Sequence, residues 1–347
     1  MKSLPTWIGL DLIFVTLLFF GCSRLNDFQK DGELQLAGLK APVKVMRDEK
    51  GMAYIYARNL KDALMAQGFV AAQDRLFNME LTRMFATGRI SEIAGEKAVA
   101  LDTRMRTIGF YRHAQNKAQL LDPESRRFFQ NYIDGVNAFI NTRPGSHHLE
   151  FKLAGIKPTP WSIADSLAIV YYMSWETSAN LNTEIIAQML VEKLGKKRAG
   201  EIFPLNINPD DPGTGLSKKP PSLDESIRLG LVSDKQTMSY LEGRLLEIGS
   251  NNWAVGAQHS PGGKPIVAND PHLDARILPG PWYPCGIITP ELRVVGVNIA
   301  GVPGMVIFRN EHVALGLTNA YGDTQDLYVE AIDPQNPDHY LEGQQSI

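Results

Sequence analysis

The chain has 347 residues, of which 44% are hydrophobic, and a formal net charge of −3 at pH 7. This length suffices for one large domain or two ordinary ones, and the charge gives no electrostatic basis for binding nucleic acid. Only two cysteines occur, Cys22 and Cys285, so a disulfide framework is excluded.

Residues 1–22 have the features of an export signal. Lys2 supplies a short positive region, and an apolar run, interrupted once by Asp11, follows from Ile8 to Phe20. This run is shorter than the roughly 20 apolar residues of a membrane-spanning helix. Gly21-Cys22 resembles the end of a bacterial lipoprotein signal, in which the cysteine becomes lipidated. We expect an exported protein, either periplasmic or anchored in the membrane by a lipid on Cys22. Simple secretion and a retained anchor stay open as alternatives.

Residues 34–203 are predicted to be mostly helical after one hairpin. Residues 43–46 alternate as a strand does, and residues 53–56 follow a turn and read as their partner. Asn59 is placed to cap a helix that Gly88 ends.

Further helices are predicted from local start signals. Pro123 occupies the first position of one helix, and Ser162 through Asp165 resembles a capping box that opens another. A break near 178–182 separates this helix from a fourth, at 184–194.

The second half of the chain changes character. Residues 204–249 are rich in Pro, Gly, Asp and Ser at first and then weakly amphipathic, which indicates a spacer. From Ser250 to 347 the signals are those of strands. The predicted strands are 252–256, 264–268, 292–300, 305–309 and 313–318.

Several familiar catalytic signatures are missing from the sequence. It contains no G-x-S-x-G elbow, no phosphate-binding G-x-x-x-x-G-K-[ST] and no H-E-x-x-H. His147-His148 has no acidic or cysteine partner at metal-ligand spacing, and we interpret it as an exposed loop pair.

Five other stretches together resemble the penicillin acylase family of N-terminal-nucleophile hydrolases, which also includes cephalosporin acylases and acyl-homoserine lactone acylases. Each stretch is weakly specific, but the five occur in the family's order over about 43–340. They are QGFVAAQDRL (67–76), TGRISE (87–92), SNNWAV (250–255), NDPH (269–272) and TNAYGDTQDLY (318–328).

The resemblance implies an α+β fold, an αββα four-layer sandwich with a helical N-terminal part, incomplete here at its C-terminus. It also implies that the precursor cuts itself between Gly249 and Ser250 and loses the spacer 204–249. Residues 34–203 would then form the α chain, and residues 250–347 would begin the β chain. The two chains of one precursor are each other's partners.

Ser250 is the candidate nucleophile. A serine hydroxyl needs a base near neutral pH, and a cut before Ser250 would free an α-amine with a pKa of about 8. Gly249 tolerates strain at the scissile bond. The resemblance assigns His272, the twenty-third residue counted from Ser250, to supporting the nucleophile and the oxyanion site, and the backbone N–H of Asn319 to the oxyanion. A serine in a turn and an unspecialised loop histidine are the alternatives.

A structural calcium site is also implied by the resemblance. Its ligands would be Asp323, Gln325 and Asp326, with Glu184 from the helical half. Carboxylate and carbonyl oxygens are the ligands that calcium prefers. This metal would take no part in the reaction, and no organic cofactor is expected. The alternative is a solvated acidic turn.

The predicted function is hydrolysis of the amide bond of an N-acylated small molecule. The substrate would be a β-lactam or an acyl-homoserine lactone, in antibiotic biosynthesis or degradation or in quorum quenching. The pocket is expected to draw on 173–181 and the region around Tyr283. The family's catalytic Asn and nearby Arg would lie beyond Ile347, so we expect a truncated fragment that is inactive alone. The alternative is a non-catalytic, exported or lipid-anchored ligand-binding protein with the acylase fold.

Overall fold

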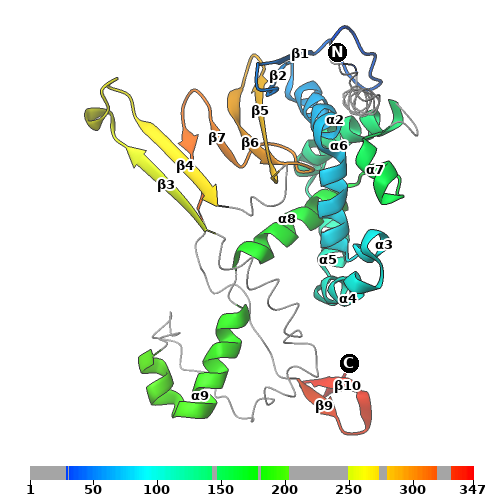
Figure 1. The fold of residues 1–347 in the computed structure, drawn as a ribbon, viewed down its shortest axis with the longest axis vertical. Coiled ribbons are helices and arrows are strands. Elements are labelled where there is room, and N and C mark those ends of the chain that lie inside the picture. The colour runs from blue at the N-terminus through cyan, green and yellow to red at the C-terminus, as the bar shows by residue number, and fades with distance from the viewer. Residues whose placement is uncertain are drawn as a thin grey trace, which may run out of the picture. The chain divides into compact units, whose positions relative to one another are not determined.

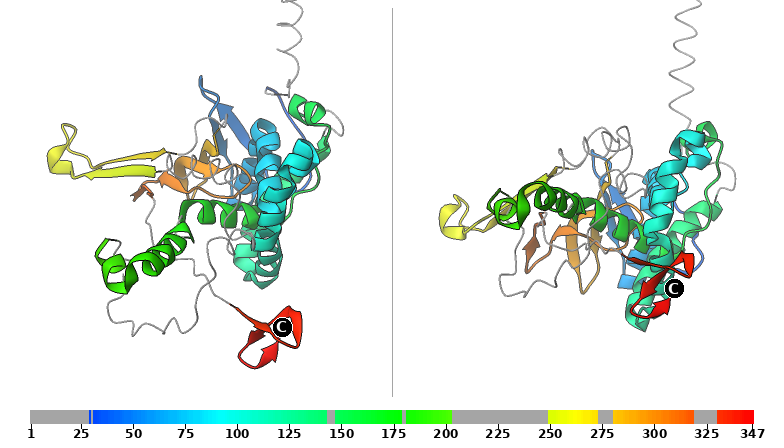
Figure 2. Two further views of the ribbon diagram at one scale, coloured as in Figure 1. Left: turned by 60° about the horizontal axis from the view of Figure 1, so that its bottom comes forward. Right: turned by 90° about the horizontal axis from the view of Figure 1, so that it is seen from below.

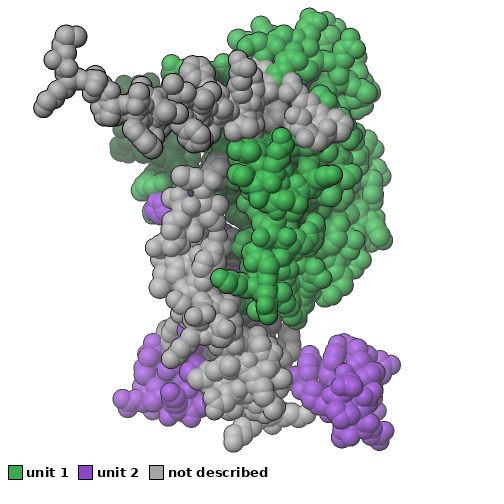
Figure 3. All heavy atoms as spheres, turned by 45° about the vertical axis from the view of Figure 1, so that its right-hand side comes forward, with its two compact units in different colours: residues 1–173, 251–270, 275–317 green, residues 174–250, 271–274, 318–347 purple. Residues whose placement is uncertain are grey.

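The computed structural model describes residues 29, 31–142, 147–178, 181–202, 249–272, 280–318 and 330–347. The predicted export signal and all of the predicted spacer except Gly249 lie outside these residues. The chain divides into two compact units (Figure 3), one made of residues 1–173, 251–270 and 275–317 and the other of residues 174–250, 271–274 and 318–347. Within the described ranges, no helix combines the length and apolar character needed to cross a membrane.

The first unit contains a six-stranded sheet that combines two strands from early in the sequence with four from late in it (Figure 1). The predicted hairpin is confirmed as β1 (Lys44–Arg47) and β2 (Ala53–Tyr56). Strand β2 then pairs in parallel with β5 (Trp282–Ile288), in a register that sets Ala53 opposite Cys285. The antiparallel strands β6 (Arg293–Ile299), β7 (Ile307–Arg309) and β8 (Ala314–Leu315) continue the sheet in that order.

Strand β5 was not predicted, although it lies in the middle of this sheet. Its sequence contains Pro284, and proline within a run argues against a central strand. In the structure β2 pairs only with Cys285–Ile288, so Pro284 lies beyond that ladder. Strands β6, β7 and β8 fall within predicted ranges but are shorter than predicted.

Helix α2 (Leu60–Thr87) is the long central helix of this unit, and its predicted ends are confirmed. The Asn59 side chain accepts a hydrogen bond from the Asp62 N–H at 2.9 Å. Gly88 ends the helix in the left-handed conformation (φ 64°). The helices that follow are α3 (Ser91–Ala94), a 3-10 turn (Gly95–Ala98), α4 (Val99–Ile108), α5 (Phe110–Leu120), α6 (Pro123–Thr142), α7 (Leu149–Ala154) and α8 (Ile163–Ser178).

Helices α2 and α6 lie side by side on one side of the sheet (Figures 1 and 2). They approach closely because each has a glycine at the crossing. A Cβ on Gly68 would lie 1.9 Å from the Tyr132 carbonyl oxygen, and a Cβ on Gly135 would lie 1.8 Å from that of Met65. Burial of the apolar face of α6 stabilises this contact; its buried residues include Ile133, Val136, Phe139 and Ile140.

The first family stretch, residues 67–76, connects α2 to the sheet side of the unit. The buried Gln67 amide donates to the Gly304 carbonyl at 2.8 Å and accepts from the Gly304 N–H at 3.1 Å. Asp74 accepts two hydrogen bonds from the Arg47 guanidinium, at 2.7 and 3.0 Å, and one from the Tyr283 hydroxyl at 2.7 Å. Tyr283, which the sequence predicts near a pocket, is 4% exposed, and this burial raises its pKa well above the ordinary value.

The second family stretch, residues 87–92, forms the corner after α2. The buried Asp102 carboxylate accepts hydrogen bonds from the Ile90 and Ser91 N–H groups, at 2.8 and 2.7 Å. Arg89 forms a two-point ion pair with Glu92, at 2.7 and 2.8 Å. The first contact fixes the backbone of the corner and the second joins two of its side chains, so this stretch contributes to the scaffold.

The predicted capping box at the start of α8 is confirmed. The Ser162 N–H donates to Asp165 at 2.7 Å, and the Asp165 N–H donates back to the Ser162 hydroxyl at 3.3 Å. The same carboxylate lies 3.5 Å from the buried Arg83 guanidinium, which also pairs with Glu80 on α2. The start of α8 is thereby attached to α2.

The interpretation of His147-His148 as an exposed loop pair is wrong. His148 is 6% exposed, and its Nε2 lies 2.9 Å from the Gln73 carbonyl oxygen. His147 is partly buried, with its Nε2 3.0 Å from the Ile140 carbonyl oxygen. Burial lowers the pKa of His148, so its neutral ring is favoured, which suits a side chain that packs against α2.

The second unit contains α9 (Leu181–Ile202), which is kinked at Gly195 (φ 75°). The predicted break before this helix falls on residues 179 and 180, which lie outside the described residues, between the last described residue of α8, Ser178, and the first of α9. An antiparallel sheet of three short strands has the order β11 (Gln345–Ser346), β10 (Asn336–Glu342), β9 (Ala331–Asp333). Helices and sheets thus occupy different segments of the described chain, which confirms the α+β class with a helical N-terminal part.

Candidate active site

Ser250 is the second residue of β3 (Gly249–Val255), directly after Gly249. Strand β3 pairs with β4 (Ile266–His272) in a two-stranded ribbon. The strands run in opposite directions (Figure 1). His272, the last residue of β4, and Ser250, near the start of β3, therefore lie at the same end of the ribbon. Both side chains reach the surface at this end, His272 being exposed and Ser250 half-buried.

The side chain of Thr318 reaches the Ser250 hydroxyl. Its Oγ1 lies 2.8 Å from the Ser250 Oγ, and it donates a hydrogen bond to the Ser250 carbonyl oxygen, also at 2.8 Å. Sequence reasoning assigned no role to this residue, although it is the first of the fifth family stretch. The sequence signal that could have identified it is its position directly before Asn319, the residue predicted to stabilise the oxyanion.

Asn269, from the fourth family stretch, ties together the neighbouring backbone. Its side-chain amide donates to the carbonyl oxygens of Asn251 and Leu317, at 3.2 and 2.9 Å, and its oxygen accepts from the Leu317 N–H at 2.6 Å. The chain passes so close here that a Cβ on Gly316 would lie 3.1 Å from the Asn269 oxygen. The residues after Ser250 and before Thr318 are therefore held by one side chain, whose role was also missed.

The structure does not describe the side chains of the other predicted site residues. Asn319, Asp323, Gln325 and Asp326 lie outside the described residues. Glu184 lies in the first turn of α9, and its side chain is not described. Across the described parts of the chain, no three His, Cys, Asp or Glu side chains gather into a metal-binding group. The oxyanion role of Asn319 and the calcium site thus remain predictions.

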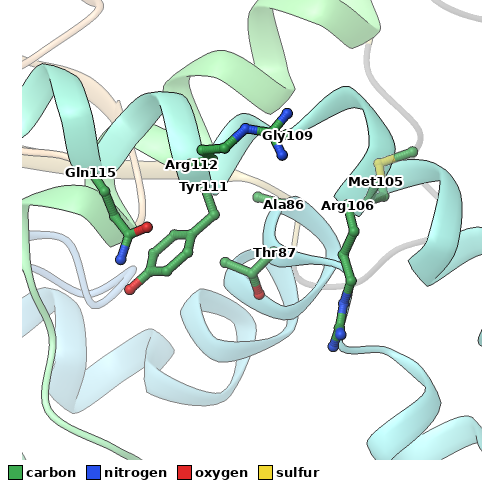
Figure 4. Close-up of a pocket in the computed structure, with 8 residues that line it drawn as sticks. All are labelled: Ala86, Thr87, Met105, Arg106, Gly109, Tyr111, Arg112 and Gln115. Atoms are coloured by element: carbon green, nitrogen blue, oxygen red, sulfur yellow. The ribbon is translucent and has the colours of Figure 1, made fainter. Parts of the chain in front are cut away.

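A pocket of about 280 Å³ lies elsewhere in the first unit, between the end of α2 and the junction of α4 with α5 (Figure 4). It is smaller than the roughly 300–1,000 Å³ of most small-molecule sites. Its lining includes Arg106 and Arg112, whose guanidinium groups point in different directions (Figure 4). None of its lining residues is a predicted site residue.

Comparison with known proteins identifies the family. The model of the penicillin amidase family matches residues 42–346. The chain is 33% identical, over 98% of its length, to acyl-homoserine lactone acylase QuiP of Pseudomonas aeruginosa. It is 33% identical, over 86% of its length, to the penicillin acylase 2 proenzyme of Pseudomonas sp. strain SE83. It spans 41% and 39% of the lengths of these two relatives, or about two fifths.

A solved structure of thermostable penicillin G acylase from Alcaligenes faecalis is also similar. It is 26% identical, and the match covers 52% of this chain and 98% of that one, with a TM-score of 0.40. At this score the likeness supports no conclusion about the fold.

Proposed function

Because the chain belongs to the penicillin amidase family, we propose that the gene product containing it is an amidohydrolase that cleaves N-acylated small molecules through Ser250. The observation that carries this proposal is the position of Ser250, which follows Gly249 at the start of β3, at the ribbon end that also holds His272. The names of the relatives favour a β-lactam or an acyl-homoserine lactone as substrate.

The proposed first event is a cut between Gly249 and Ser250. The Ser250 Oγ attacks the carbonyl carbon of Gly249, and the Ser250 nitrogen leaves as an amine. Water then hydrolyses the ester that joins Gly249 to the Ser250 hydroxyl. The products are a carboxylate on Gly249 and a Ser250 that carries both its hydroxyl and a free α-amine. Glycine is suited to this bond because it tolerates the strained backbone of the tetrahedral intermediate.

In the proposed turnover, the same hydroxyl attacks the substrate amide. The α-amine takes the hydroxyl proton, directly or through water, and returns it to the leaving amine. The developing oxyanion would be stabilised by His272 and by the Asn319 N–H; losing one such donor typically costs about 2.7–4 kcal/mol of transition-state stabilisation. Water then releases the acid from the acyl-enzyme and regenerates the hydroxyl.

Two further features are proposed from the sequence. A calcium ion would be held by Glu184, Asp323, Gln325 and Asp326, a set of hard oxygen donors, and would stabilise the fold without entering the reaction. The apolar leader would direct export to the periplasm, where Cys22 would offer a site for a lipid anchor.

Mass spectrometry of the exported gene product tests the self-cleavage. A new N-terminus at Ser250 is expected, and a chain that stays intact would contradict autoprocessing.

Acid release from penicillin G and from a long-chain acyl-homoserine lactone tests the turnover. Ser250→Ala should abolish it, whereas Ser260→Ala, in the turn between β3 and β4, should not. Full activity of Ser250→Ala would refute Ser250 as nucleophile. Substrate binding without hydrolysis by the unmodified protein would favour the alternative of a ligand-binding protein.

A further inference from the structure

The two contacts of the Thr318 hydroxyl determine which way its hydrogen bonds run. A hydroxyl carries one proton and can accept two hydrogen bonds. The Ser250 carbonyl oxygen can only accept, so Thr318 donates its proton there. The 2.8 Å contact between the two hydroxyl oxygens must then be donated by Ser250. Thr318 thus accepts a hydrogen bond from the Ser250 hydroxyl while it donates one to the main-chain carbonyl of the same residue.

We propose that Thr318 is a positioning residue that holds the Ser250 hydroxyl in one rotamer for attack. The proposal rests on the proposed function of Ser250 as nucleophile. A serine side chain has three staggered rotamers, and the bridge from Oγ through Thr318 to the Ser250 carbonyl selects one of them. Thr318 does not act as the base, because a neutral hydroxyl does not hold an extra proton near pH 7.

The bridge serves both the self-cleavage and the turnover. The cut breaks the bond between the carbonyl carbon of Gly249 and the nitrogen of Ser250. The two atoms that Thr318 contacts, Oγ and the carbonyl oxygen, both stay with Ser250. The bridge is therefore not interrupted by the cut, and the nucleophile meets the substrate in the rotamer in which it met Gly249.

The Thr318 hydroxyl is not needed to hold its own segment in place. The preceding residue, Leu317, is bound through both its N–H and its carbonyl to Asn269. Thr318 is exposed, so replacing its hydroxyl by a methyl group buries no new surface. Thr318→Val should therefore change the chemistry and leave the fold intact, whereas Asn269→Ala should loosen the backbone on both sides.

The test compares Thr318→Val, Thr318→Ser, Asn269→Ala and Ser250→Ala in the gene product containing this chain. The readouts are the time course of cleavage at Ser250 by intact mass, kcat and KM on penicillin G or a long-chain acyl-homoserine lactone, and the melting temperature. Thr318→Val removes the hydrogen bond between the two hydroxyls and lets the Ser250 side chain occupy its other rotamers. We therefore expect this variant to lower the cleavage rate and kcat about tenfold. KM and the melting temperature should stay unchanged, and Thr318→Ser should recover most of the rate.

Three results would overturn the proposal. If Thr318→Val retains the parent rates while Ser250→Ala is inactive, Thr318 does not position the nucleophile. If Thr318→Val and Asn269→Ala lower the melting temperature and the rates alike and Thr318→Ser gives no rescue, the role is structural. If Ser250→Ala retains full activity, the proposed function itself fails, and the role of Thr318 fails with it.

Discussion

A methyl group added at Gly68 tests how closely α2 and α6 must approach. A Cβ there would lie 1.9 Å from the Tyr132 carbonyl oxygen, whereas real Cβ atoms essentially never come within 3.0 Å of another atom. The helices would have to separate by about 1 Å, against backbone that cannot rotate away as a side chain can. Such overpacking costs about 1–3 kcal/mol and sometimes more, while the better helix propensity of alanine returns at most about 1 kcal/mol. We expect Gly68→Ala to lower the free energy of unfolding by about 2 kcal/mol.

Urea denaturation followed by circular dichroism measures this change. The matched control is Gly200→Ala in α9, where an added Cβ would meet nothing within 4 Å. This control should leave the free energy of unfolding unchanged or raise it by up to about 1 kcal/mol. If Gly68→Ala is as stable as the parent, or if both variants lose the same stability, the close crossing does not determine the packing of these helices.

Three further predictions concern the corner after α2, the buried histidine and the calcium site. Asp102→Ala removes two hydrogen bonds to a buried carboxylate and should cost about 3 kcal/mol in urea denaturation; a loss below about 1 kcal/mol would contradict this. Burial lowers the pKa of His148 below its ordinary 6.5, so the unfolded chain takes up this proton first, and stability is lost as the pH falls below 6.5. His148→Gln should reduce the drop in melting temperature between pH 7.5 and pH 5.5, and an unchanged drop would count against this role. Chelation with EDTA should lower the melting temperature of the gene product, and Ca²⁺ but not Mg²⁺ should restore it; a melting temperature that does not respond would exclude a stabilising calcium ion.

The helix ends could be predicted because they depend on neighbours in the sequence. Asn59 reaches the N–H of Asp62 three residues on, and Ser162 and Asp165 bond to each other. Such contacts form within one turn of helix, whatever the rest of the chain does. The same reasoning missed α3, α4 and α5. Gly95 and Gly109 follow the first two of these helices, but none of the three has a side-chain cap at its start.

Strand β5 and the burial of His148 could not be predicted, because both depend on contacts across the fold. The parallel pairing of β2 with β5 joins residues from opposite ends of the chain, and nothing in either segment alone specifies that partner. His148 is buried through its contact with the Gln73 carbonyl on α2. Histidine is intermediate between the buried and the exposed residue types, so the packing of the loop against the helix decides its burial.

The described residues of the five family stretches separate into two kinds by their contacts. Residues 67–76 hold α2 to the sheet through Gln67 and Asp74, and Arg89 of the stretch 87–92 lies 3.9 Å from Glu80 of α2. These contacts would be equally useful in a protein without activity. Among the described residues, Asn269 likewise binds backbone groups. The hydroxyls of Ser250 and Thr318 are different, because their contact at an exposed strand end stabilises no core. A ligand-binding protein of this fold could lose both hydroxyls at little cost in stability, whereas the proposed enzyme could not lose that of Ser250. This pair of side chains therefore distinguishes the two functions better than the family resemblance as a whole.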